Sequence, residues 1–248
     1  MCEDCGCSIS QTKSHVHDHE RGHNHPHVHK HVSENINLTV IAKILEKNNL
    51  KAEEIRAFLA EKNIFCVNLM SSPGGGKTSL LEETAKFLGK KMSVIEGDLE
   101  TNKDADRIKK HGIQAYQITT GQTCHLDAVM VKHGLSHLNL ENIEYLFIEN
   151  VGNLVCPASY DVGSHLNVAL LSIPEGDDKA AKYPVMIRKA DCVLISKTDL
   201  LPHFEYNIEN VKKDIEAINP HAQILNISIK NKESISGWID FLQTKKSP

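Results

Sequence analysis

The 248-residue sequence predicts an α/β fold in which helices flank a mostly parallel central sheet, preceded by a disordered tail rich in cysteine and histidine. Three observations predict it. Short apolar runs alternate with amphipathic stretches, a glycine-rich loop directly follows the first run, and the composition changes sharply near residue 33. Alternating strands and helices form parallel sheets with helices on both faces.

The tail is predicted to span residues 1–33. Residues 1–32 hold three of the seven cysteines and eight of the fifteen histidines, with Ile9, Val16, Val28 and Val32 as the only branched aliphatic residues. Such a segment buries too little apolar surface to offset the entropy lost on ordering. The remainder, 34–248, is expected to form one domain.

The elements of that domain follow from the hydrophobic pattern. Two N-terminal helices are expected within about 34–62, with a break at Asn48-Asn49 and the second from Ala52 to about Lys62. Short runs rich in branched aliphatics predict buried parallel strands, and amphipathic stretches between several of them predict helices. The strands are predicted at 64–70, 92–95, 145–148, 168–173, 192–195 and 224–227, and the helices at 77–89, 103–111, 125–134, 205–218 and 234–244.

Composition argues against several classes of protein. The net charge of −4 gives no electrostatic support for a nucleic-acid partner. No run of about 18 apolar residues predicts a membrane span, and no apolar signal-peptide core follows Met1. Seven cysteines, an odd number, favour reduced thiols over a disulfide framework. A cytoplasmic protein is therefore expected.

The glycine-rich loop reads Ser71-Ser-Pro-Gly-Gly-Gly-Lys77-Thr78 and lies between a predicted strand and a predicted helix. Backbone N–H groups in such a loop approach phosphates closely, the lysine reaches the β- and γ-phosphates, and the threonine hydroxyl binds Mg²⁺. Ser71 stands where the common pattern has glycine, and the alternative is an ordinary glycine-rich turn. The pattern predicts a P-loop NTPase whose phosphate-binding residues are Gly74, Gly75, Gly76, Lys77, Thr78 and Ser79.

Two acids at predicted strand ends are candidates for the magnesium site of a P-loop enzyme. Asp98 and Glu149 each follow an apolar run, and Gly152 stands where its N–H can meet a γ-phosphate. The alternative for each acid is a solvated carboxylate. We expect catalysis to depend on Lys77, Thr78, Asp98 and Glu149.

Two later segments indicate the base. Ser196-Lys197-Thr198-Asp199 resembles the Asn-Lys-x-Asp guanine motif, with Ser196 in place of Asn, and Ser228-Ile-Lys230 resembles the loop that supports the guanine. A carboxylate that accepts from guanine N1 and N2 would be left unpaired by adenine. Lys197, Asp199, Ser228 and Lys230 therefore predict GTP as the nucleotide.

Metal-ligand patterns are concentrated in the predicted tail. Cys2, Cys5 and Cys7 can converge on one ion, and thiolate with nitrogen suits Ni²⁺ whereas tetrahedral sulfur suits Zn²⁺. The alternative is a set of reactive surface thiols. The histidine tract between residues 15 and 31 can hold several ions weakly, unless it is an affinity tag.

A third pattern lies in the domain itself. Cys124-His125 is expected to open the helix at 125–134, and Cys156 follows Glu149 by seven residues. The sequence does not place residues 124 and 156 together, so two core cysteines and a helix-capping histidine remain the alternative. Cys66 and Cys192, within predicted strands, are interpreted as core residues.

The motifs together resemble the HypB family, GTPases that help insert nickel into [NiFe]-hydrogenase. The resemblance covers the whole chain and rests on these segments: CEDCGC at 2–7, SSPGGGKTSLLEET at 71–84, VIEGDLETNKDADRI at 94–108, GQTCHLDA at 121–128, IENVGNLVCPASYDVG at 148–163, EGDDKAAKYP at 175–184 and SKTDLLPH at 196–203. The related urease GTPase shares the nucleotide motifs.

The resemblance implies a role for each cluster. Cys2, Cys5 and Cys7 match a tight nickel site, and Cys124, His125 and Cys156 match a weaker Ni²⁺ or Zn²⁺ site shared at a GTP-stabilised homodimer interface. Thr78, Asp98 and Glu149 match positions associated with Mg²⁺, and the region 36–62 resembles a partner-docking region.

The expected partners are a small HypA-type metallochaperone and the hydrogenase large-subunit precursor. We expect slow intrinsic GTP hydrolysis because no candidate arginine finger is evident. A metal-storage protein and a urease-maturation GTPase remain alternatives.

Overall fold

One parallel sheet organises the protein. The computed structural model describes residues 32–100 and 103–247, with side chains described from Val40 onward. Within these residues seven strands form one sheet in the order β3-β2-β4-β1-β5-β6-β7, and every neighbouring pair is parallel, which confirms the predicted fold class. The strands are β1 (Phe65–Ser71), β2 (Met92–Asp98), β3 (Gln114–Thr119), β4 (Tyr145–Glu149), β5 (Leu166–Ser172), β6 (Cys192–Ser196) and β7 (Gln223–Ile227).

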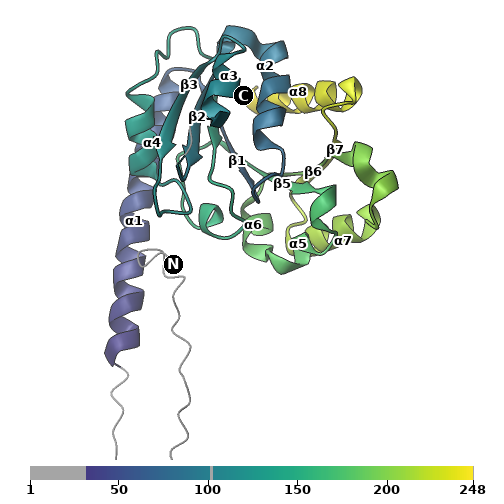
Figure 1. Cartoon of the computed structure of the whole chain (residues 1–248). Coiled ribbons are helices and arrows are strands. Elements are labelled where there is room, and N and C mark those ends of the chain that lie inside the picture. The colour runs from purple at the N-terminus through teal and green to yellow at the C-terminus, as the bar shows by residue number, and fades with distance from the viewer. Residues whose placement is uncertain (1–31, 101–102, 248) are drawn as a thin grey trace, which may run out of the picture.

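Helices cover both faces of this sheet (Figure 1). One face packs against α2 and α8, and the other packs against α1 and α4 at one end and against α6 and α7 at the other. The helices are α1 (Val32–Glu61), α2 (Lys77–Leu88), α3 (Lys103–Lys109), α4 (Ala128–Leu135), α5 (Lys179–Lys182), α6 (Pro184–Lys189), α7 (Ile208–Ile218) and α8 (Lys232–Lys246).

Side chains alternate between the two faces of the sheet along each central strand, so the hydrophobic core is divided into clusters on opposite faces. On β1, Val67 and Leu69 join the cluster under α2 and α8, whereas Cys66 and Met70 join clusters on the opposite face. Successive residues of a strand point to opposite faces, so strands buried on both faces are apolar throughout. Cys66 and Cys192 are fully buried, which confirms their interpretation as core residues.

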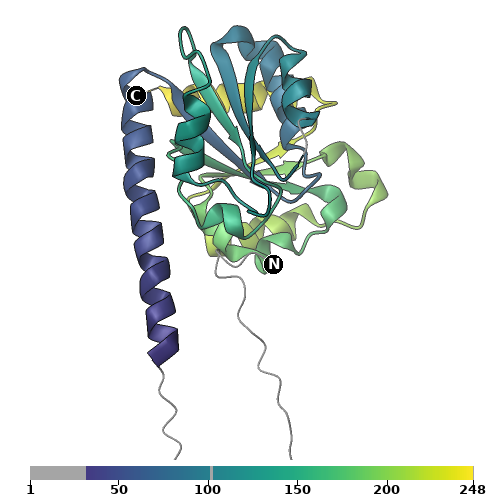
Figure 2. The ribbon, with the colours of Figure 1, turned by 60° about the vertical axis from the view of Figure 1, so that its left-hand side comes forward.

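The predicted break at Asn48-Asn49 is wrong, because α1 runs through it without interruption. Asn48 is only 6% exposed, and its amide bonds Asp161 and Ala128 on other segments. These tertiary contacts outweigh the weak helix propensity of asparagine. The N-terminal part of α1 projects past the rest of the domain (Figure 2), and Ile41 and Ile44 on it are 40% and 46% exposed.

The other differences concern short or polar elements. The strand β3 was not predicted because Gln114–Thr119 is an edge strand of mixed polarity, and α5 and α6 are too short for a clear helical period. The six predicted strands and the helices at 77–89, 103–111, 205–218 and 234–244 are confirmed to within a few residues. Residues 1–31 of the predicted tail lie outside the described residues.

Across residues 32–100 and 103–247, no helix combines the length and apolar character that crossing a bilayer requires.

Candidate functional site

The glycine-rich loop connects the carboxyl end of β1 to the amino end of α2, as predicted. Gly76, the residue before the helix, has a φ of 103°, which favours glycine. At Gly75 an added Cβ would lie 2.6 Å from the Ser71 hydroxyl oxygen, so only glycine fits. The loop therefore brings its backbone to the start of α2, where helix N–H groups and the helix dipole favour phosphate.

Lys77 lies inside this loop with 7% of its surface exposed. Its Nζ is 3.1 Å from the Ser71 hydroxyl oxygen, so the serine at the unusual first position contacts the key lysine. Burial lowers the pKa of Lys77, and the nearby Glu149 carboxylate opposes that shift. A phosphate would supply the negative charge that favours the ammonium form.

The predicted magnesium residues meet at the same edge of the sheet. The Thr78 hydroxyl donates to Glu149 Oε1 at 2.7 Å, and Asp98 ends the neighbouring strand β2. The residues Thr78, Asp98 and Glu149 line one cavity of about 430 Å³ together with the loop. Burial raises the pKa of Glu149 to about 7, with Lys77 acting in the opposite direction.

Glu96 is an acid in this cavity that the sequence prediction missed. It pairs in register with Glu149, is 2% exposed, and has a pKa raised to about 8, first by burial and then by the Glu149 charge. Among the described residues neither Glu96 Oε2 nor Glu149 Oε2 has a hydrogen-bond partner. Two buried oxygens without donors fit a divalent cation. The available signal was a charged residue directly after the predicted strand at 92–95.

Arg107 and Asp104 on α3 also line the cavity and were not predicted. The Arg107 guanidinium pairs with Glu82 and Asp104 and donates to the Ser79 hydroxyl. An arginine is therefore present beside the phosphate loop, but its donors bind carboxylates of the same chain.

The guanine motifs lie against the loop. Ser196 Oγ donates to the Gly75 carbonyl at 2.8 Å, and Lys197 Nζ donates to the Gly74 carbonyl at 2.6 Å. The serine that replaces the usual asparagine thus bonds the loop backbone directly.

The proposed base reader, Asp199, is joined to the second guanine segment. Its carboxylate accepts from the Ser228 hydroxyl at 2.7 Å and from Lys230 Nζ at 3.0 Å. These two contacts, the serine first, lower the pKa of Asp199. The aspartate is therefore held as a carboxylate, the form that accepts from guanine N1 and N2.

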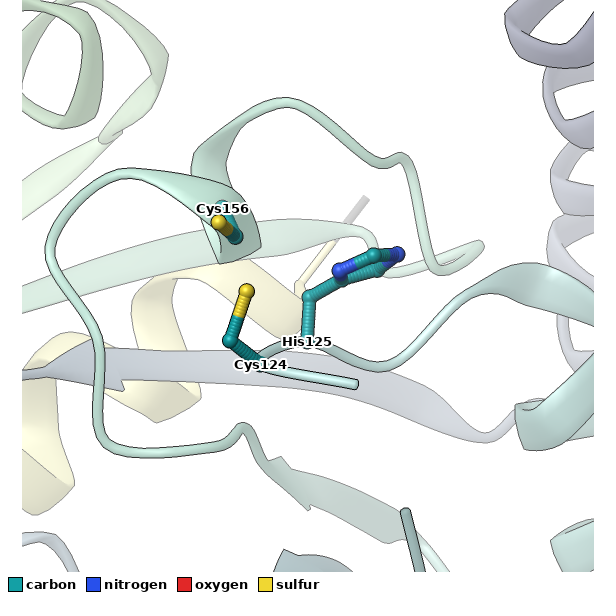
Figure 3. A group of neighbouring side chains, drawn as sticks. All are labelled: Cys124, His125 and Cys156. Atoms are coloured by element: carbon teal, nitrogen blue, oxygen red, sulfur yellow. The ribbon is translucent and has the colours of Figure 1, made fainter. Parts of the chain in front are cut away.

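Cys124, His125 and Cys156 form a cluster that residue spacing did not assemble, although the family resemblance implied it. One donor atom from each residue lies within 4.8 Å of the others (Figure 3). Cys124 is half-buried, while His125 and Cys156 are 5% and 6% exposed. Two sulfurs and an imidazole suit Ni²⁺ or Zn²⁺.

Two loops carry these ligands. The helix predicted at 125–134 is confirmed to within three residues, but Cys124 and His125 precede it instead of opening it: α4 begins at Ala128, and Asp127 caps it by accepting from the Met130 N–H. Cys156 follows β4 and begins a short 3₁₀ turn.

The His125 ring stacks on Tyr160, with centroids 3.8 Å apart. Burial lowers the pKa of His125, against the raising effect of Asp127, so the neutral imidazole that binds metals is favoured. Tyr160 was not predicted, because nothing in the sequence marks an aromatic ring as support for a ligand 35 positions away. The predicted ligands Cys2, Cys5 and Cys7, and the histidine tract, lie outside the described residues.

Comparisons with known proteins agree with this geometry. Residues 65–226 match the family described as CobW/HypB/UreG, nucleotide-binding domain. The "Hydrogenase/urease maturation factor HypB" of Helicobacter hepaticus is 46% identical over 215 residues, 85% of this chain and 89% of that protein. The "Hydrogenase maturation factor HypB" of Azotobacter vinelandii is 44% identical over 217 residues, covering 87% and 72%.

Two solved structures are also similar. The crystal structure of HypB from Helicobacter pylori in complex with nickel has a TM-score of 0.79 and 46% identity, covering 81% of this chain and 95% of that one. HypB from Archaeoglobus fulgidus has a TM-score of 0.76 and 38% identity, covering 82% and 100%. The sequence, the fold and the arrangement of the nucleotide loop thus agree, and the chain belongs to the HypB family of maturation factors.

Proposed function

We propose that this chain is a metal-regulated GTPase and nickel metallochaperone that stores nickel and delivers it during maturation of [NiFe]-hydrogenase. GTP hydrolysis controls dimerisation and metal release. The observation that carries the proposal is the segment leaving β4: Glu149 faces the phosphate cavity, and Cys156, seven residues later, belongs to the cluster with Cys124 and His125. The names of its relatives, and the nickel complex of the H. pylori protein, support the same function.

The nucleotide site supports hydrolysis of GTP to GDP and phosphate. Lys77 and the loop N–H groups stabilise charge on the phosphates, and Thr78, Asp98 and Glu149, joined by Glu96, would hold Mg²⁺. Water attacks the γ-phosphate in line with the leaving oxygen. Because Arg107 is engaged by Glu82 and Asp104, it supplies no free cation, and turnover is slow.

The metal cluster supports reversible binding of nickel. One chain supplies three donors, so a fourth ligand comes from water or from a second copy of the chain in the GTP-stabilised homodimer. If the nucleotide changes nickel affinity, nickel changes nucleotide affinity by the same factor. Zn²⁺ suits the same donors and is the alternative occupant.

The tail and the partners complete the proposal. Cys2, Cys5 and Cys7 form the tight nickel site, and the histidine tract acts as a reservoir. The partners are a HypA-type metallochaperone and the hydrogenase large-subunit precursor, in the cytoplasm.

The test measures nickel release from the cluster. Cluster nickel is defined as the nickel bound by the full chain minus that bound by Cys156→Ala, with Cys192→Ala as the control that removes a core thiol. We expect release to differ between GDP and a non-hydrolysable GTP analogue. Equal release in the two states refutes the coupling, and an unchanged nickel stoichiometry in Cys156→Ala refutes the site.

A urease-maturation role is the second candidate, because the H. hepaticus relative is named for both enzymes. In a strain that makes both enzymes, deletion of this protein distinguishes the roles by which apo-enzyme fails to receive nickel. The storage alternative is separated by deleting residues 1–32: a delivery GTPase retains hydrogenase maturation when nickel is plentiful.

A further inference from the structure

Asn150 lines the nucleotide cavity, and its side chain reaches the segment that carries Cys124 and His125. It follows Glu149, and only 1% of its surface is exposed. Its Oδ1 accepts from two backbone groups at once, Val151 N and Leu126 N, each at 3.0 Å. Its Nδ2 donates to Asn68 Oδ1 at 3.2 Å, which fixes the orientation of the amide. A single oxygen therefore joins two segments that are 25 positions apart.

The first of these segments contacts the phosphate loop. Val151 precedes Gly152, where an added Cβ would lie 3.0 Å from Cα, N and Cγ of Pro73. Gly152 thus packs directly on the backbone of the loop, and Pro73, Val151 and Gly152 all line the phosphate cavity. This segment is therefore within direct reach of a change in the contents of that cavity.

The second segment carries the metal ligands. Leu126 follows His125, is fully buried, and covers Gly97 of β2, where an added Cβ would lie 2.7 Å from Leu126 Cγ. Gly97 lies between Glu96 and Asp98, so Leu126 packs against the strand that carries the acids of the cavity. A shift of the Leu126 backbone must move the adjacent His125.

A second buried amide holds the metal loops without contacting the nucleotide site. Asn48 of α1 accepts from Ala128 N at 2.9 Å and donates to the Asp161 carbonyl at 2.8 Å. Ala128 begins the helix after His125, and Asp161 follows Tyr160, which stacks on His125. Asn48 is therefore a matched comparison: the same side chain supports the same loops from a helix outside the cavity.

We propose that Asn150 is a positioning residue that transmits the nucleotide state from the Val151–Gly152 segment to the Leu126 backbone beside the metal cluster. Asn48, in contrast, fixes the shape of the cluster in both nucleotide states. This inference rests on the proposed function, because it assigns the residue through which GTP alters nickel binding. Both N–H groups share one acceptor, and an unpaired buried N–H is costly. A displacement of Val151 that carries the Asn150 side chain with it therefore either moves Leu126 or breaks the hydrogen bond of the Leu126 N–H.

The first experiment needs no metal. Hydrogen exchange at the Leu126 amide is measured in the metal-free full chain with GDP and with a GTP analogue. In the wild type we expect protection to depend on the nucleotide, and in Asn150→Ala we expect fast exchange in both states. In Asn48→Ala the nucleotide dependence at Leu126 is retained. If the Leu126 amide of the wild type exchanges at the same rate with GDP and with the GTP analogue, the inference is overturned.

The second experiment measures cluster nickel in both nucleotide states. Allosteric couplings commonly change affinity by about 5- to 150-fold. The ratio of the nickel affinities with GTP analogue and with GDP should differ from one in the wild type and fall close to one in Asn150→Ala. Asn48→Ala should weaken nickel binding equally in both states and keep the wild-type ratio. A wild-type ratio retained in Asn150→Ala overturns the relay. A wild-type ratio of one, with a nucleotide-dependent Leu126 amide, refutes the proposed coupling of GTP to nickel instead.

Thermal unfolding shows whether each variant folds. If Asn150→Ala does not, Asn68→Ala is used, because it keeps Asn150 but removes the partner that orients its amide. We expect Asn68→Ala to reduce the nucleotide dependence at Leu126, and full retention of that dependence contradicts the relay.

Discussion

The nucleotide site and the metal cluster lie side by side but are built differently. The candidate phosphate and magnesium residues Asp98 and Glu149 end parallel strands, and Lys77 and Thr78 follow the loop between β1 and α2, so the sheet itself sets their positions. The candidate metal ligands stand on two loops whose positions depend on side-chain contacts from Asn48, Asn150 and Tyr160. A strand-supported site holds a fixed geometry, whereas a loop-supported site can change its geometry when a few hydrogen bonds change.

The largest expected effect comes from Lys77→Ala. Losing the buried ammonium removes the charge that stabilises the transferring phosphoryl group, and GTP hydrolysis falls by about 100-fold or more. Cluster nickel in the nucleotide-free chain is unchanged, because no ligand is supported by Lys77. Hydrolysis rates and nickel titration measure the two effects, with the exposed Lys90→Ala as control. A parallel loss of nickel would show that the two regions share one framework.

Asp199→Asn should change the base selectivity from guanine to xanthine without changing how the bound nucleotide affects nickel release. The carboxylate accepts from two guanine N–H groups, and losing this match lowers GTP affinity by about 100-fold. The new amide suits xanthine, which presents a carbonyl where guanine has its amino group. Competition binding with GTP and XTP tests this, with Asp240→Asn as control. An XTP analogue should then alter nickel release as a GTP analogue does in the wild type; failure to do so would mean that the base, and not the phosphate, controls the cluster.

Glu96→Gln tests how much stability is lost when the buried carboxyl of Glu96 ionises in the nucleotide cavity. The pKa of Glu96 is raised to about 8 in the folded protein from an ordinary 4.5, so the unfolded chain ionises this group more readily. The contribution of Glu96 to stability is present below its pKa in the unfolded chain, and it is lost as the pH rises toward its pKa in the folded protein. Between pH 6 and pH 8 the wild type should lose about 2 kcal/mol relative to Glu96→Gln.

Urea unfolding of the nucleotide-free chain in EDTA at the two pH values measures this difference. Glu216→Gln, at an exposed position on α7, is the control. If wild type and Glu96→Gln differ in stability by the same amount at both pH values, the pKa of Glu96 is not raised. The cavity is then more hydrated than the burial of Glu96 indicates.

The smallest expected effect is that of Ser196→Ala. It removes the hydrogen bond to the Gly75 carbonyl, worth about 1 kcal/mol, so GTP affinity should fall about 5-fold with cluster nickel unchanged. Ser93→Ala is the control, since that buried hydroxyl has no partner among the described residues. Equal GTP affinities of Ser196→Ala and the wild type would show that this serine does not substitute for asparagine in the guanine motif.

The two regions also differ in how far the sequence predicted them. Loop glycines, Lys77 and the acids after apolar runs are contiguous motifs, and a parallel sheet brings strand ends together, so Asp98 and Glu149 were found. Glu96 was missed although it directly follows the predicted strand at 92–95, because the sequence does not show that β2 continues to Asp98 and pairs Glu96 with Glu149. From residue spacing the cluster was found only as separate motifs, because loops that follow different strands carry no sequence signal of contact; the family resemblance alone grouped the three residues.

By itself, the sequence determined the alternation of strands and helices and the position of the phosphate loop, and it predicted the guanine segments and the metal ligands, because local spacing and composition encode each of these. Tertiary structure alone decided that α1 continues through Asn48, that Cys156 lies with Cys124 and His125, and that Asn150 joins Val151 to Leu126. The physical reason is common to all three. Each depends on a hydrogen bond or a close approach between residues 24 or more positions apart, which folding around the sheet creates.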